Sequence, residues 1–149
     1  MKGFTLIELF IVIGIFVVLA SVAMPVYGGW LSAAQLDAAI AETRSGLRQA
    51  RTLGIAGKND SAHGIYFSID PAGADAFVLY QGSTYAARET GYDLETALPG
   101  SLEIGFDGGA EINFSKGSGE PDAAGTITIT HGGSGETAQI VVNGLGIIE

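Results

Sequence analysis

A long apolar run near the start of the chain limits what it can fold into more than any other feature. No charged residue occurs between Glu8 and Asp37, and residues 4–24 are almost entirely apolar. As a helix, this run would rise about 31 Å, about the thickness of the hydrocarbon core of a bilayer. Lys2 precedes the run, and the first basic residue after it is Arg44. The positive-inside rule therefore predicts a single-pass membrane protein with its N-terminus in the cytoplasm.

Three interpretations of the run compete. A cleavable signal peptide would use residues 9–20 as its apolar core and residues 21–23 as a small-residue cleavage site. A plain membrane anchor is the second interpretation. Neither gives a role to Glu8, whose carboxylate would cost roughly 2.5–3.5 kcal/mol on insertion scales and so needs a compensating partner.

The third interpretation rests on the residues around Glu8. Residues 2–9, Lys-Gly-Phe-Thr-Leu-Ile-Glu-Leu, resemble the class III signal of type IV prepilins. The resemblance implies that a prepilin peptidase cuts between Gly3 and Phe4, removes residues 1–3 as a leader, and leaves Phe4 to be N-methylated. It implies that Glu8 neutralises the amine of a neighbouring subunit during assembly. Pro25 falls where many pilins of this kind carry a helix-kinking proline.

Helical periodicity continues beyond the apolar run. One stripe is formed by Leu36, Ile40, Leu47, Ala50 and Gly54. Gly57, followed by Asn-Asp, predicts the end of the helix. A break or bend is expected near residues 25–29, because proline inside a helix costs ~3 kcal/mol and glycine about 1 kcal/mol. The prediction is one long helix, with a transmembrane or filament-core part at 4–27 and an amphipathic half at 28–57.

After residue 60 the apolar period changes to two. The alternation predicts strands at residues 64–69, 77–80, 102–106, 110–114, 126–130 and 139–142. Asp-Gly-Gly at 107–109 predicts that the third and fourth of these strands form a hairpin. Residues 58–149 are thus expected to form a β-rich globular domain. The predicted fold class is α+β, a long N-terminal helix, transmembrane in its first half, packed on an antiparallel sheet.

The globular part has a family resemblance of its own. The helix end at residues 46–53, the strand at 64–67 and the ending at 139–146 are similar to the GspH/FimT family of minor pilins and pseudopilins. The resemblance implies a pilin fold. Some FimT-like members bind DNA through basic residues near the C-terminus, but here the matching region carries Glu136 and Glu149. With a net charge of −9, no nucleic-acid partner is expected.

No catalytic, cofactor or metal site is expected. His63 and His131 each lie beside a glycine in a predicted turn without a second ligand at metal spacing, and the chain has no cysteine. Ser134 lacks the flanks of a nucleophile elbow. A loop-bound Ca²⁺ stays open at the acidic loop residues, although they lack the spacing of an EF-hand. These are Asp70, Asp75, Asp107 and Asp122.

Two surface features each leave two roles open. Arg44, Arg48 and Arg51 lie at i, i+4 and i+7 beside the apolar stripe. They form either a solvated face or a basic strip that meets acidic surfaces of adjacent subunits. The segment 82–99 is long for a hairpin loop, so it is either a partner-contact loop or a surface insertion packed by its tyrosines.

The expected function is structural. The chain would be a minor pilin or pseudopilin of a type IV pilus, a type II secretion or a DNA-uptake machine, not an enzyme. Its implied partners are the prepilin peptidase, other pilin or pseudopilin subunits and the bacterial inner membrane, with the globular domain in the periplasm or on an extracellular filament. The alternative is a secreted or filament-tip, adhesin-like binding module with an ordinary signal peptide. A mature chain beginning at Phe4 or at Met24 separates the two.

Overall fold

The computed structural model describes residues 4–71 and 73–149, with the backbone alone for residues 22–27. This part of the chain contains one long α-helix, seven strands and three single-turn 3-10 helices. In chain order they are α1 (Leu6–Ala56), η1 (Lys58–Asp60), β1 (His63–Ser68), β2 (Ala76–Gln81), η2 (Tyr85–Ala87), η3 (Thr90–Tyr92), β3 (Leu94–Ala97), β4 (Leu102–Phe106), β5 (Glu111–Phe114), β6 (Gly125–His131) and β7 (Thr137–Val142). The α+β class is therefore confirmed.

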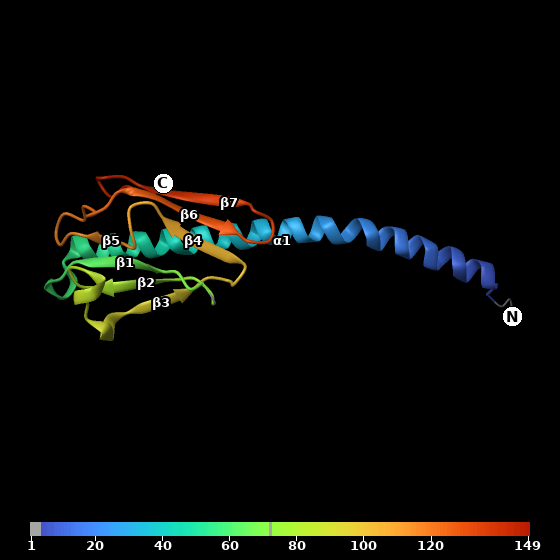
Figure 1. Ribbon diagram of the computed structural model, residues 1–149, viewed down its shortest axis with the longest axis horizontal. Helices are drawn as coiled ribbons and strands as arrows, with labels where there is room; N and C mark the ends of the chain where they lie inside the picture. The colour runs from blue at the N-terminus through green and yellow to red at the C-terminus, as the bar shows by residue number, and fades with distance from the viewer. Residues whose placement is uncertain (1–3, 72) are drawn as a thin grey trace.

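Helix α1 is continuous over its whole length. It ends as predicted at Gly57, whose left-handed backbone (φ 57°) lets its N–H cap the carbonyls of Leu53 and Gly54. The predicted break does not occur, because the backbone stays helical through residues 25–29, and Figure 1 shows only a gentle curve. A proline removes one main-chain hydrogen bond, but its fixed φ is close to the helical value, so helical turns on both sides can continue through it.

The strands form two antiparallel sheets, ordered β3-β2-β1-β5 and β4-β6-β7. The predicted hairpin of β4 and β5 is wrong. β4 pairs with β6 and β5 pairs with β1, so residues 107–109 carry the chain from one sheet to the other. The Asp107 carboxylate supports this crossing by accepting the N–H of Thr126, at the start of β6, at 2.6 Å.

One hydrophobic core lies between the second half of α1 and the two sheets (Figure 1). The predicted helix stripe is confirmed, since Leu36, Leu47 and Ala50 are buried in this core. The one glycine of the stripe, Gly54, allows close approach. A Cβ built on Gly54 would lie only 2.9 Å from the carbonyl oxygen of Phe114 on β5, so the helix backbone rests almost directly on this sheet.

Asp75 ties the two sheets together from the inside. Its side chain is buried, and its two carboxylate oxygens accept the N–H of Asp70 at 2.9 Å and the N–H of Ile104 on β4 at 2.8 Å. Both oxygens are therefore used by the main chain. The role that the sequence leaves open for Asp75, as a calcium ligand in a loop, is thereby replaced by a structural one.

The expected placement in the inner membrane needs correction. Among the described residues, no helix is long and apolar enough to cross a membrane. The predicted single-pass topology is therefore contradicted.

Candidate assembly surface

The first half of α1 projects away from the globular domain (Figure 1). Its apolar side chains lie in solvent on every side of the helix, with exposed fractions from 43 % for Val12 to 72 % for Leu6. Among the helix residues whose side chains the structure describes, Ser32 and Leu36 are the first that are buried. The apolar residues of this segment are spread over all sides of the helix rather than along one stripe. No rotation of the helix about its axis could therefore bury all of them against the domain. We call residues 6–21 the free half of α1.

This amount of exposed apolar surface calls for a covering partner. Fully burying one large aliphatic or aromatic side chain contributes roughly 1.5–3 kcal/mol. Covering only five of them is therefore comparable with the whole stability of a typical domain, about 5–15 kcal/mol. Exposed apolar patches of this kind mark interaction surfaces. Because the apolar residues surround the helix, the surface fits several neighbouring apolar elements better than one flat partner.

Glu8 closes the start of α1 through a capping box with Thr5. The Thr5 hydroxyl oxygen accepts the N–H of Glu8 at 3.3 Å, and one Glu8 carboxylate oxygen accepts the main-chain N–H of Thr5 at 2.9 Å and its hydroxyl at 2.7 Å. The main-chain bond from Thr5, followed by the hydroxyl bond, lowers the pKa of Glu8. Sequence reasoning missed Thr5, although Thr-x-x-Glu before an apolar run is a helix-start signal.

The remaining residues of the predicted processing and assembly site are placed in part. Phe4 is exposed and precedes the capping residue, so it lies outside the helix. Gly3, on the other side of the predicted cut, lies outside the described residues. The backbone of Pro25 is part of α1, and its side chain lies outside the part of the chain that the structure describes. The structure brings Phe4 and Glu8 to the same end of the helix but does not bring Pro25 near them.

Hydrogen bonds fix α1 to the domain at Ser32 and Gln35, where the helix first contacts the domain. The Ser32 hydroxyl donates to the Glu136 carboxylate at 3.0 Å, and Ser134 donates to the same oxygen at 3.1 Å. From the start of β4, in the same sheet, the Ser101 hydroxyl donates to the side-chain oxygen of Gln35 at 3.1 Å. The helix therefore leaves the domain from a held position rather than from a loose joint.

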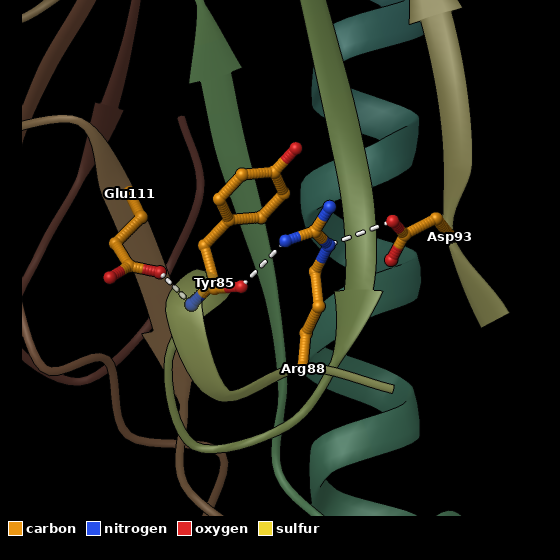
Figure 2. Close-up of polar contacts among 4 residues, drawn as sticks. All are labelled: Tyr85, Arg88, Asp93 and Glu111. Atoms are coloured by element: carbon orange, nitrogen blue, oxygen red, sulfur yellow. Dashed lines mark hydrogen bonds and ion pairs between the residues drawn. The ribbon is translucent and has the colours of Figure 1, made fainter. Parts of the chain in front are cut away.

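The segment 82–99 is packed by its tyrosine, as one of the two interpretations has it. The Tyr85 ring is stacked on Tyr66 of β1 at 3.8 Å, and the Arg88 guanidinium lies 3.7 Å from its centroid. Arg88 also donates to the Tyr85 carbonyl and pairs with Asp93 at 2.7 Å (Figure 2). The pairing with Asp93 raises the pKa of Arg88. This part of the segment is thus held in one conformation.

A buried polar network lies beneath that segment. The Tyr80 hydroxyl, on β2, donates to the Glu111 carboxylate at 2.5 Å and accepts the side-chain N–H of Asn113 at 3.0 Å. Glu111 also accepts the N–H of Tyr85 at 2.7 Å (Figure 2). Burial, and then the bond to Glu111, raises the pKa of Tyr80 far above its usual range. These hydrogen bonds join β2, β5 and the start of the segment 82–99.

The histidines do not both lie where the sequence places them. His63 is not in a surface turn but at the start of β1, only 3 % exposed, and desolvation by this burial lowers its pKa. His131 ends β6 and its Nδ1 accepts the N–H of Ser134 at 3.0 Å within a turn. Within residues 4–71 and 73–149, no three His, Cys, Asp or Glu side chains gather closely enough to hold a metal ion.

Comparisons with known proteins complete the description. No family model, no curated protein and no solved structure matches this chain.

Proposed function

We propose that this protein is a structural subunit of a helical filament of the type IV pilus or type II secretion kind, a minor pilin or pseudopilin. In this proposal a prepilin peptidase removes residues 1–3, and the free halves of α1 from many copies bundle into a common core. The globular domain then faces outward. The chemistry required of the chain is association, with no catalytic step.

The observation that carries the proposal is the exposure of the free half of α1. Its apolar side chains surround the helix, and the globular domain leaves them uncovered. A bundle of like helices would cover all of its sides at once, whereas a single docking partner would leave some in water. The prepilin-like residues 2–9 support this reading independently, because they place a processing signal directly before the same helix.

The capping box gives Glu8 a defined position before assembly. Cleavage after Gly3 would leave the N–H and hydroxyl of Thr5 intact, so the cap would survive processing. The Glu8 carboxylate uses one oxygen for both Thr5 bonds, which leaves the other oxygen for the amine of a neighbouring Phe4. A pair formed in the apolar interior of a bundle would be much stronger than one in water.

The test is processing and incorporation of the full chain in a bacterium that carries a prepilin peptidase and a pilus assembly machine. Intact-mass analysis should give a mature chain that begins at N-methylated Phe4. Gly3→Glu should keep the leader, and Glu8→Leu should be processed but reduced in the sheared-filament fraction. Glu42→Leu is the matched control, because Glu42 is an exposed carboxylate farther along the same helix.

Two outcomes would reject the proposal. A mature mass that begins at Met24 would favour the secreted binding module with an ordinary signal peptide. A correctly processed chain that never enters the sheared-filament fraction would reject the filament role itself. If Glu8→Leu enters filaments as well as Glu42→Leu does, pairing of Glu8 with a neighbouring amine is wrong, while the filament role stands.

A further inference from the structure

Exposed large apolar side chains of the globular domain gather mainly in two places. One is a surface groove of about 390 Å³ between the last turns of α1 and the chain near residue 147. The basic groove, as we name it, is lined by Arg48, Arg51, Thr52, Ile55, Gly146, Ile147 and Ile148. The other is the acidic edge, which consists of Tyr92, Leu94 and Glu95 at and before β3. Ile55, Ile147, Tyr92 and Leu94 are between 45 % and 55 % exposed.

Arg51 builds the floor of the basic groove. Its guanidinium donates to the carbonyls of Gly119 at 3.3 Å and Leu145 at 3.0 Å. Gly146 is required here, since its left-handed backbone (φ 75°) brings it so close that a Cβ would lie 2.7 Å from the Arg51 Nε. A guanidinium has five N–H donors, and these two bonds use two of them. The groove is thus a fixed site with positive charge.

Arg48 stands exposed beside that floor, one turn of α1 before Thr52. Among the described residues, ion pairs form between Arg88 and Asp93 and between Lys116 and Asp60, and neither involves the arginines of α1. The Arg44 Nε is even buried without a hydrogen-bond partner. In a chain with 16 acidic and 7 basic residues, a row of arginines without a carboxylate partner calls for an acidic partner from outside the chain.

The acidic edge has the complementary chemistry. Leu98 donates its N–H to Asp75 on the β2 side, and the alternation of an antiparallel strand then turns the N–H groups of Glu95 and Ala97 away from β2. β3 is the outermost strand of its sheet, so this edge is open. Glu95 presents a free carboxylate on one face of this strand, and Leu94 presents an exposed apolar side chain on the other, so a partner that meets the strand edge-on contacts both.

We propose that the basic groove of one copy of this chain binds the acidic edge of a second copy. Arg48 would pair with Glu95, while Tyr92 and Leu94 cover the apolar wall formed by Ile55 and Ile147. The proposal rests on the filament function above and specifies the contact between outer domains. A nucleic acid is the less suitable occupant, because the strongly acidic chain would repel its phosphates.

The positions of the two surfaces determine the geometry of such an assembly. β3 lies at one margin of the domain, and the C-terminal segment lies at the opposite margin, with α1 between them (Figure 1). A contact between opposite margins is heterologous: each copy keeps one unused surface of each kind, so the array extends rather than closing as a dimer. This is the kind of contact that a filament requires.

Disulfide trapping tests the contact directly, since the chain has no native cysteine. Single-cysteine chains Thr52→Cys and Leu94→Cys are coexpressed in the assembling bacterium and oxidised. The expected product is the mixed dimer, in excess over either homodimer. Ile69→Cys, at an exposed apolar residue outside both surfaces, replaces Leu94→Cys as the matched control and should give no mixed dimer. Phe16→Cys reports separately on bundling of the free halves.

Charge reversal tests the specificity. Arg48→Glu should lower the yield of the mixed disulfide roughly fivefold to tenfold. The substitution replaces an ion pair with a repulsion between two carboxylates, and the total change is about 1 kcal/mol or more. Adding Glu95→Arg on the partner chain should restore the yield. Adding Glu103→Arg instead, at an exposed carboxylate on β4, should not restore it.

The outcomes separate this contact from the filament function. Dimers through Phe16→Cys without the mixed dimer would reject the contact and leave the filament in place. Absence of both kinds of dimer would reject both. A symmetric Leu94→Cys homodimer as the main product, or binding of duplex DNA that depends on Arg48, would also overturn the contact.

Discussion

At the scale of single residues, several charged or polar groups are already satisfied within the chain. Glu8 is bound to Thr5, Asp75 to two main-chain N–H groups, and Tyr80 to Glu111. Arg48 and Glu95 differ from these, because their charges face solvent without a partner among the described residues. Unpaired charges at complementary surfaces, rather than charge in general, are what make a residue a candidate for recognition.

The capping box makes the start of α1 sensitive to acid. The folded pKa of Glu8 lies below its ordinary value of 4.5, so its contribution is fully present above pH 4.5 and is lost as the pH falls through the folded pKa. We expect amide exchange at residues 6–8 to accelerate only below pH 4.5, with a Glu8 carboxyl NMR midpoint also below 4.5. Glu8→Gln, which can still cap, should remove this pH dependence. A midpoint at or above 4.5 would contradict the capping role.

The pKa of Tyr80 is shifted in the opposite direction to that of Glu8, so its contribution to stability depends on pH in the opposite way. Its folded pKa is raised above the ordinary value of 10.0, so its contribution is fully present below pH 10 and is lost as the pH rises from there toward the folded pKa. Tyr80→Phe should flatten the fall in urea stability above pH 10. At neutral pH it should lower the free energy of unfolding by about 1.5–3 kcal/mol, because the hydrogen bond to the Glu111 carboxylate and the one from Asn113 are both lost. Tyr92→Phe, at an exposed tyrosine, is the control. If the two variants lose urea stability equally above pH 10, the proposed role of Tyr80 in the alkaline loss of stability is wrong.

At the scale of elements, α1 combines two helices of different kinds in one continuous rod. Its second half follows an amphipathic stripe and touches both sheets, whereas its free half is apolar all round. The same glycine substitution should therefore have opposite effects where the helix packs on a sheet and where it is exposed, because what surrounds the added methyl group differs.

Gly54→Ala and Gly28→Ala form a matched pair within α1. Alanine improves helix propensity by about 1 kcal/mol at either position. At Gly54 the methyl group meets the Phe114 carbonyl at 2.9 Å, so we expect a net loss of about 1–2 kcal/mol from overpacking. Nothing lies within 4 Å at Gly28, so its variant should unfold at the same or a higher temperature. Thermal unfolding of both variants measures this, and a stabilised Gly54→Ala would show that β5 can move away.

At the scale of the whole molecule, folding and association are assigned to different parts of the chain. The hydrophobic core begins at Leu36 and draws on both sheets, and none of its members lies in the free half of α1. The two proposed contacts are also separate, with the free half in the filament axis and the basic groove with the acidic edge on the outside. Each can therefore be removed without the other.

A chain that begins at residue 28 should consequently fold without the free half. We expect a soluble monomer in light scattering, with the same urea midpoint as the full chain, because the core is complete. The acidic domain should not bind duplex DNA at physiological salt. An aggregated or unfolded product would show that the free half contributes to the fold, and a salt-sensitive gel shift at micromolar concentration would refute the charge argument.

The sequence by itself determined those features that depend on neighbours along the chain. The stripe from Leu36 to Gly54, the helix end at Gly57 and six of the seven strands follow from periods of 3.6 and 2. The apolar run and the residues around Glu8 likewise identify the part of the chain that the domain leaves exposed. β3 escaped prediction, because residues 94–97 are few, mostly exposed and without apolar alternation.

Only the tertiary structure decided which distant residues meet. β4 turned away from β5 to pair with β6, because the partner of a strand depends on the edge that the fold leaves available and not on the turn alone. The same holds for the burial of His63 and for the opposite placement of the basic groove and the acidic edge. The groove joins residues about 95 positions apart in the chain, and no local pattern of residues encodes such a separation.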